Sequence, residues 1–247
     1  MWTKTALITG AAGAIGAALC RAFRDDGFRV IATDKTHPDP SCCDESIDID
    51  LNALVEDAEY RDSAIRNIFE AIGDQRLDVL VNNAAIQIVA SLDGLGIDDW
   101  RQSLNVNLLA PFLLIQGLLP RLKEAKGSVL NIGSIHTKLT KSRFSCYATS
   151  KAALSGLTRC LAVELGSAVR INEITPAATE TPMLLAGFDG RTDLLEALGA
   201  AHPMGRIASP DEIARVAVFL ASEKASFITG ASIPVDGGIG GRLHDPE

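Results

Sequence analysis

Seven apolar, β-prone runs recur along the 247-residue chain, with helical patterns between them. They cover residues 5–9, 29–33, 46–49, 77–81, 128–132, 169–175 and 232–235. This rhythm predicts a parallel sheet of about seven strands in an α/β fold. Because the runs are continuously apolar rather than alternating, we expect a doubly wound sheet with helices on both faces. The length suits one domain over residues 1–247, and no shift in composition marks a second.

A glycine-rich segment, residues 9–16, follows the first run and precedes a helical pattern that we expect to end near Gly27. Such a turn between strand and helix lets the backbone approach a pyrophosphate, which then sits at the helix N-terminus. Glycines also gather in plain turns, so this segment alone is a weak signal. Asp34 ends the second run, where a carboxylate can bind adenosine ribose hydroxyls and repel a 2′-phosphate. The alternative for Asp34 is an ordinary turn residue.

Tyr147 and Lys151 stand four residues apart, and Ser134 lies thirteen residues before the tyrosine. Residues at i and i+4 share one face of a helix. An ammonium close to a phenol favours the phenolate, so we expect Lys151 to lower the pKa of Tyr147 from its reference of about 10. Tyr147 would then be an acid/base near neutral pH. Such pairs are also common on helices without a catalytic role, so the pair alone does not establish a site.

Charge and hydropathy exclude several classes of partner. The formal net charge of −8, with no basic run, argues against nucleic acid and anionic membranes as partners. The most apolar stretch, 104–120, is interrupted by Asn105, Asn107, Pro111 and Gln116. We therefore expect a buried or interface helix there rather than a membrane span.

Five cysteines form neither an even disulfide set nor a zinc spacing, so we expect reduced thiols and no metal site. Cys146 adjoins Tyr147, but nothing in the sequence activates it as a nucleophile, and it is interpreted as a small apolar residue. The chain enters its first apolar run within four residues, which leaves no room for a signal peptide. Together these features predict a cytoplasmic protein.

Further polar segments follow the predicted strands at their carboxyl ends, where ligands bind in open parallel sheets. Asp50 and Leu51 follow the third run, residues 82–85 (Asn-Asn-Ala-Ala) the fourth and residues 176–181 the sixth. Over residues 5–238 the chain resembles the short-chain dehydrogenase/reductase family. The sequence motifs that carry this resemblance are residues 9–16, 82–85, Asn107, Ser134, Tyr147, Lys151, 176–181 and 235–238. The resemblance implies a single-domain Rossmann-type fold and an NAD(P)-dependent oxidoreductase.

The resemblance also implies which residues bind the cofactor. Gly10, Gly13, Ile15 and Gly16 would shape the turn that holds the pyrophosphate, and Asp34 would bind the adenosine ribose. Asp50 and Leu51 would flank the adenine, and Asn83 and Ala84 would line the cofactor ribose. Thr179 and Thr181 would contact the nicotinamide carboxamide and the phosphates.

The four catalytic positions of the family are present. Tyr147 would exchange the proton with the substrate oxygen, and Lys151 would lower its pKa while binding the nicotinamide ribose. Ser134 would polarise and orient that oxygen, and Asn107 would support a water-filled proton relay to Lys151. Hydride would pass directly between the nicotinamide and the substrate carbon, so the protein supplies geometry and proton transfer.

Three family glycines are alanines here: Ala14, Ala85 and Ala177. Each adds a methyl group near the expected ligands, and a position that needs positive φ would cost about 1 kcal/mol as alanine. We expect these to be tolerated variants. Asp34 favours NAD over NADP, whereas Lys35 could instead face a 2′-phosphate.

The substrate is less constrained. Gln87, His136, Phe144 and Met183, with Lys138, are expected around the reacting carbon, and residues 183–204 are expected to form a substrate lid. This polar mixture suits a small polyhydroxy or carboxylate compound better than a steroid. The leading hypothesis is oxidation of a secondary alcohol with NAD. The alternatives are an NADPH-dependent carbonyl or 3-oxoacyl-thioester reductase and a non-catalytic nucleotide sensor on the same fold.

Two helical segments predict a homo-oligomer, with a homotetramer favoured over a dimer. Residues 104–119 are apolar over more than one stripe, so one side is expected to face the sheet and another a partner subunit. Residues 147–165 are rich in small side chains that allow a second helix to approach closely. The alternative is that all of this apolar surface packs within one subunit.

Overall fold

The computed structural model describes residues 4–243. Residues 1–3, on which the prediction of no signal peptide partly rests, lie outside the described range. One parallel sheet of seven strands runs through the molecule in the order β3-β2-β1-β4-β5-β6-β7. The strands are β1 Lys4–Thr9, β2 Phe28–Asp34, β3 Glu45–Asp48, β4 Val79–Asn82, β5 Ser128–Ile132, β6 Arg170–Pro176 and β7 Ser232–Val235. The predicted α/β fold is confirmed.

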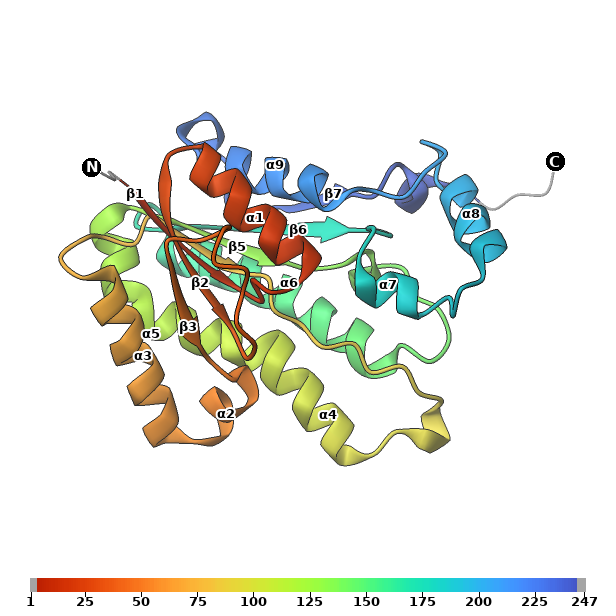
Figure 1. Cartoon of the computed structure of the whole chain (residues 1–247), viewed down its shortest axis with the longest axis horizontal. Coiled ribbons are helices and arrows are strands. Elements are labelled where there is room, and N and C mark those ends of the chain that lie inside the picture. Colours follow the sequence, from red (N-terminus) through yellow and green to blue (C-terminus); the bar gives the residue numbers. More distant parts are fainter. Residues whose placement is uncertain (1–3, 244–247) are drawn as a thin grey trace.

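Helices cover both faces of the sheet (Figure 1). On one face lie α1 (Ala14–Asp25) and α9 (Pro210–Ala221), and on the other α3 (Ala58–Ile72), α5 (Ala110–Ala125) and α6 (Ser145–Leu165). The shorter helices are α2 Leu51–Glu56, α4 Ile97–Leu104, α7 Pro182–Ala186 and α8 Thr192–Ala201. Single helical turns at Leu92–Gly94, Ile135–Thr137, Glu223–Ala225 and Ile239–Gly241, with a π-helical segment at Asn105–Leu109, complete the helical structure of the described range.

Strand β1 shows why the predicted runs are continuously apolar. Ala6 and Ile8 pack in the core beneath α1 and α9, whereas Leu7 packs in the core beneath α3 and α5. All three side chains are fully buried. Successive side chains of a strand point to opposite faces, so a strand covered on both faces needs apolar residues at every position.

Helix α1 ends as its sequence predicts. Its last residue is Asp25, Asp26 caps it, and Gly27 follows with φ +86°. Glycine adopts this left-handed conformation without the steric penalty of a side chain.

The apolar segment 104–120 needs a correction. It belongs to one continuous helical stretch, Ile97–Ala125, of 29 residues with a mean hydropathy of 1.4. By length and composition alone, this stretch is long and apolar enough to cross a membrane. The polar interruptions therefore do not exclude a span by composition. Packing identifies the helix instead, because Leu114, Leu118 and Leu122 lie in the core against the sheet. The predicted buried helix is present for this reason.

Candidate active site

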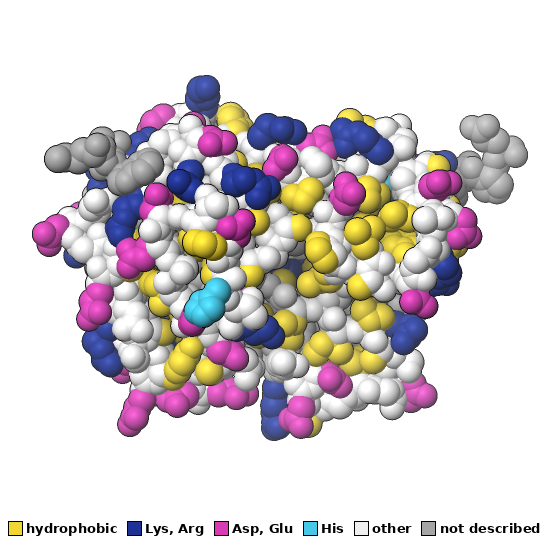
Figure 2. Space-filling view, in the orientation of Figure 1, with side chains coloured by type: hydrophobic (Ala, Val, Ile, Leu, Met, Phe, Trp, Pro, Cys, Tyr) yellow, Lys and Arg dark blue, Asp and Glu magenta, His cyan; other side chains and the backbone are white. Residues whose placement is uncertain are grey.

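The carboxyl ends of the strands open into a cleft of about 970 Å³, a size ordinary for small-molecule sites. It lies between β1 and β4, where the strand order reverses, the place at which open α/β sheets bind ligands. Figure 2 shows hydrophobic side chains gathered over α7, beside the hollow at the centre of the view. All predicted site residues except Asn107 and Lys138 line the cleft: Gly10, Gly13, Ile15, Gly16, Asp34, Asp50, Leu51, Asn83, Ala84, Gln87, Ser134, His136, Phe144, Tyr147, Lys151, Thr179, Thr181 and Met183.

The glycine-rich turn is shaped so that two of its positions accept only glycine. Gly10 has φ +66°, and a Cβ there would lie 2.6 Å from the Cα of Ala84. A Cβ on Gly16 would lie 2.0 Å from the carbonyl oxygen of Gly10. At Gly13, the N-cap of α1, the nearest atom would be 3.4 Å away. Packing within the protein thus requires Gly10 and Gly16, and the turn lies at the N-terminus of α1 in the cleft, a position that fits a pyrophosphate.

The alanines that replace family glycines carry no backbone penalty. Ala14 is the first residue of α1, and neither it nor Ala85 or Ala177 is among the non-glycine residues with positive φ in the described range. The possible cost of about 1 kcal/mol therefore does not arise at these positions.

Asp34 ends β2 beside the glycine-rich turn. Its Oδ2 accepts a hydrogen bond of 3.0 Å from the backbone N–H of Ala12, and its Oδ1 accepts one of 3.3 Å from that of Thr36. These contacts fix a carboxylate at the end of the cleft where the resemblance places the adenosine ribose. Lys35 also lines the cleft, as the competing interpretation required.

The opposite wall is built from the residues after β3 and β4. Asp50 caps α2, accepting a hydrogen bond of 2.8 Å from the N–H of Asn52. The side-chain amide of Asn83 donates to the carbonyl of Thr9 at 2.9 Å, and the Thr9 hydroxyl accepts from the N–H of Ala84 at 3.0 Å. These bonds tie the end of β4 to the end of β1 and hold the segment 83–84 against the glycine-rich turn.

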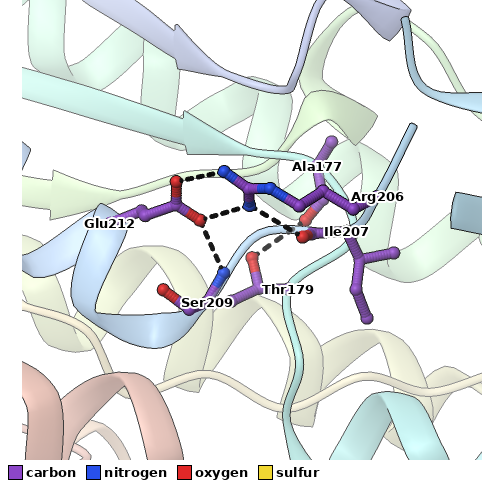
Figure 3. A network of polar contacts seen from close by, with 6 residues as sticks. All are labelled: Ala177, Thr179, Arg206, Ile207, Ser209 and Glu212. Carbon is purple, nitrogen blue, oxygen red and sulfur yellow. Dashed lines mark hydrogen bonds and ion pairs between the residues drawn. The ribbon is translucent and has the colours of Figure 1, made fainter. Parts of the chain in front are cut away.

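The segment after β6 is anchored from α9, as Figure 3 shows. Thr179 pairs with Ala208 in an isolated parallel bridge. Close to it, the guanidinium of Arg206 donates hydrogen bonds of 2.7 and 2.8 Å to the two oxygens of Glu212, which also accepts one of 2.9 Å from the N–H of Ser209. Glu212 belongs to the first turn of α9. This network fixes the loop that holds Thr179 at the edge of the cleft.

Tyr147 and Lys151 come from the start of α6, and Ser134 directly follows β5 and the glycine at position 133. Ser134 Oγ accepts a hydrogen bond of 3.2 Å from the N–H of His136. Burial raises the pKa of Tyr147 above its ordinary 10.0, and a hydrogen bond with Ser134 opposes that rise. Burial lowers the pKa of Lys151 to about 8. Three of the four side chains predicted to be catalytic, those of Ser134, Tyr147 and Lys151, thus lie together in the cleft.

The expectation that Lys151 lowers the pKa of Tyr147 is wrong for this arrangement. Lys151 Nζ lies 5.9 Å from the centroid of the Tyr147 ring and donates a hydrogen bond of 2.6 Å to the carbonyl oxygen of Ile132. Because the ammonium is directed to that carbonyl, burial of the phenol dominates its pKa. Of the two groups, Lys151 loses its proton first, because burial lowers its pKa to about 8 and raises that of Tyr147.

Asn107 lies behind the cleft and is fully buried. It stands in the π-helical segment Asn105–Leu109 between α4 and α5; such bulges recur at functional sites. Its amide donates hydrogen bonds of 3.0 Å to the carbonyl of Ile86 and to Ser150 Oγ, and its Oδ1 accepts one of 2.9 Å from the N–H of Ile86. Asn107 therefore braces the segment after β4 against α6, one residue before Lys151, and its role in a proton relay stays a prediction.

Two of the substrate residues predicted from the sequence, His136 and Phe144, pack against Tyr147. The His136 ring stacks on Phe144 with centroids 4.6 Å apart and meets the Tyr147 ring at 5.8 Å. Burial and the nearby Lys141 lower the pKa of His136, so its ring is neutral at pH 7. Gln87 and Met183 contribute further to the cleft wall.

Lys138 was predicted near the reacting carbon, but it is exposed and does not line the cleft. Lys141 does, with its Nζ 4.7 Å from the centroid of the Phe144 ring. The cleft also includes Arg191 and His202, which fall within the predicted lid segment 183–204 but were not singled out there as site residues. They lie outside every family marker, and only the folding of the segment after β6 over the cleft brings them there.

Comparison with known proteins identifies the family of the chain. The chain matches the family model described as Enoyl-(Acyl carrier protein) reductase over residues 10–240. It is 36% identical over 244 residues to D-threitol dehydrogenase of Mycolicibacterium smegmatis, covering 95% of this chain and 92% of that one. It is 36% identical over 248 residues to the 3-oxoacyl-[acyl-carrier-protein] reductase of Thermotoga maritima, covering 96% and 97%. The ligand-free aldohexose dehydrogenase of Thermoplasma acidophilum superposes with a TM-score of 0.91 at 31% identity, covering 99% and 96%.

The fold and the cleft define a nicotinamide-dependent oxidoreductase. The chain belongs to the short-chain dehydrogenase/reductase family, whose members use NAD(P) to interconvert hydroxyl and keto groups of small molecules.

Proposed function

We propose that this protein is an NAD-dependent dehydrogenase that interconverts a secondary alcohol and its ketone. The observation that carries the proposal is that Ser134, Tyr147 and Lys151 line the same cleft as the glycine-rich turn and Asp34. The chemistry that the cofactor supplies is hydride transfer to or from the substrate carbon. The chain itself would orient the substrate oxygen and handle its proton.

Each catalytic side chain has one task in this proposal. Tyr147 takes the proton from the substrate hydroxyl or returns it to the ketone oxygen. The Ser134 hydroxyl donates a hydrogen bond to that oxygen and fixes its position. Lys151 binds the nicotinamide ribose and shares its proton with Tyr147 as a titrating pair. Asn107 holds α6 in place through Ser150 and supports a water relay to Lys151.

NAD is the proposed cofactor because Asp34 places a fixed carboxylate where a 2′-phosphate would lie, and repulsion between the two charges disfavours NADP. One observation favours the second candidate, an NADPH-dependent carbonyl or 3-oxoacyl-thioester reductase. Lys35 lines the cleft next to Asp34 and offers a cation to a phosphate. The carboxylate is the group bonded to the turn, so NAD remains the leading proposal.

The substrate proposed is a small polyhydroxy or carboxylate compound. Asp34 and Asp50, the acidic residues that line the cleft, belong to the cofactor end, whereas Lys141 and Arg191 are cations near the other end. Neutral His136 adds polar hydrogen-bonding capacity beside Tyr147. Relatives named for D-threitol and for trans-4-hydroxycyclohexanecarboxylate support both compound types. We also propose that residues 183–204, which include α7 and α8 beside the cleft, act as the substrate lid.

We propose a cytoplasmic homotetramer as the working form. All five cysteines are free thiols, as the reducing cytoplasm maintains. Large apolar side chains remain exposed on the helical segments predicted to form interfaces, among them Leu109 and Val163. Surface of this kind suits contact with another subunit.

Turnover by purified protein tests the proposal. NAD and NADP would each be offered with polyols, hydroxy acids and cyclic secondary alcohols, and the appearance of reduced cofactor would be followed by absorbance. The proposal predicts turnover with NAD for at least one compound class. Binding of NAD in a thermal-shift assay, with no turnover for any alcohol or ketone, would favour the nucleotide sensor instead.

A further inference from the structure

Two charged side chains are buried in the part of the chain from 4 to 243, and they have opposite signs. Lys151 is 2% exposed and Glu173 is 0% exposed, whereas the other Asp, Glu, Lys and Arg side chains of this range are less completely buried. Because an isolated charge in a protein interior is costly, buried charges occur with a partner of opposite sign. The mechanism above gives a task to Lys151 and none to Glu173.

Two short hydrogen bonds hold the carboxyl group of Glu173. Ser155 and Ser232 each donate a hydroxyl hydrogen bond to Glu173 Oε2, both with a length of 2.6 Å. Lengths of about 2.5–2.7 Å are typical of O–H donors to charged carboxylates. The two donors come from α6 and from β7, where Ser232 pairs with Glu173 in the sheet.

The second carboxylate oxygen faces the catalytic segment. Glu173 Oε1 has no hydrogen-bond partner among the described residues. A Cβ built on Gly133 would lie 2.3 Å from it, so only glycine leaves room for the carboxylate. Gly133 is flanked by Ser134 and by Ile132, whose carbonyl oxygen accepts the hydrogen bond from Lys151. The carboxylate therefore borders the strand end that holds Lys151, and its partner Ser155 lies one helical turn after that lysine.

We propose that Glu173 is a positioning residue of this site, whose buried carboxylate keeps the shared proton on the Tyr147–Lys151 pair. This inference rests on the proposed function. The negative charge favours the ammonium form of Lys151 and opposes the lowering of its pKa by burial. Without it, the pair would lose its first proton at a lower pH, and the enzyme would lose the acid form needed for ketone reduction.

The test compares pH profiles of the intact enzyme. The substitution Glu173→Gln removes the charge and keeps the shape. We expect the midpoint at which kcat/KM for ketone reduction falls to move to lower pH by about one unit, the low end of the range for a nearby opposite charge. The matched control is Ser232→Ala, which removes one hydrogen bond to the carboxylate but leaves the charge, and it should keep the wild-type midpoint.

Two results would overturn the inference. In the first, the pH midpoint of kcat/KM for Glu173→Gln equals that of the wild type. In the second, Ser232→Ala shifts this midpoint as much as Glu173→Gln does, which would show that packing rather than charge causes the effect. Should Glu173→Gln not fold, Glu173→Val offers a neutral side chain suited to a buried strand and the same comparison. If the wild type shows no turnover at all, the proposed function fails separately. The pKa of Lys151, measured by NMR in wild type and Glu173→Gln without ligands, then still tests the inference, with equal values contradicting it.

Discussion

The ammonium of Lys151 lies 5.9 Å from the centre of the Tyr147 ring, and both groups are held where their charged forms are disfavoured. Burial raises the pKa of the phenol and lowers that of the amine to about 8. Lys151 therefore loses its proton first, just above neutral pH, and we propose that Tyr147 exchanges its proton with this amine. Tyr147 would accept the hydroxyl proton when an alcohol is oxidised and donate a proton to the oxygen when a ketone is reduced, so the protonation state of these two residues controls both directions.

The pair predicts opposite pH dependences for the two directions. Reduction needs the fully protonated pair, so kcat/KM for the ketone should fall as the pH rises through about 8, the pKa of Lys151. Oxidation needs the pair after loss of one proton, so kcat/KM for the alcohol should rise over the same interval. Steady-state rates in both directions, measured over a series of buffers at constant ionic strength, check this. Profiles that fall together with rising pH would contradict it.

Asp34 should determine the cofactor. Replacing it with alanine removes the carboxylate at the end of β2, and Asp34→Ser with Lys35→Arg adds a phosphate partner as well. We expect the ratio of kcat/KM for NAD to that for NADP to fall at least about tenfold in the double variant, because charge repulsion is replaced by attraction. Wild-type protein that prefers NADP would overturn the assignment of NAD.

Lys141 should contribute to binding of an anionic substrate. Lys141→Gln should raise KM for a hydroxy acid by roughly 2–5-fold, the strength of a solvent-exposed ion pair, and leave KM for the corresponding neutral amide unchanged. Lys138→Gln is the matched control, since Lys138 carries the same charge three residues away but does not line the cleft. Equal effects of the two variants, or equal effects on acid and amide, would exclude a carboxylate contact at Lys141.

The assembly is open to a direct measurement of mass. Light scattering at micromolar concentration should give four times the chain mass of 26.1 kDa. Val163→Asp, at a position of α6 that is 86% exposed, should shift the population toward smaller species because it places a charge in the proposed apolar contact. A stable and active wild-type monomer would refute the homotetramer.

Much of this molecule could be predicted because its signals are local. Ile8, Ile31 and Val81 belong to apolar runs, and the helices that connect these runs along the chain cover both faces of the sheet they form. The predicted strands agree with β1–β7 to within a few residues. Gly10 and Gly16 were identified by spacing, and the structure shows the close backbone contacts that require them.

What could not be predicted depends on contacts between distant segments. Glu173 is one acidic residue inside an apolar run, and nothing near it in sequence shows that Ser155 and Ser232 bind it. The segment 183–204 was predicted as a lid, but the sequence does not show which of its side chains, such as Arg191 and His202, reach the cleft, because this depends on the path of the chain after β6. The shift in the pKa of Tyr147 was predicted in the wrong direction. Helical spacing gives the separation of Tyr147 and Lys151 along the helix, but it does not show that the phenol is buried or that Lys151 donates its hydrogen bond to the carbonyl of Ile132.

Tyr147→Phe tests the central claim most directly, because the substitution removes only the phenol oxygen that would carry the proton. The measurement is kcat/KM for the best alcohol with NAD, together with the Kd for NAD and the melting temperature of the same preparation. The account predicts a loss of about 10²–10⁴-fold in kcat/KM, the range for removal of an acid/base group, with NAD affinity within a few-fold and an intact fold. Retention of more than about a tenth of the wild-type rate, well outside that range, would contradict the assignment of Tyr147 as the proton-transfer residue.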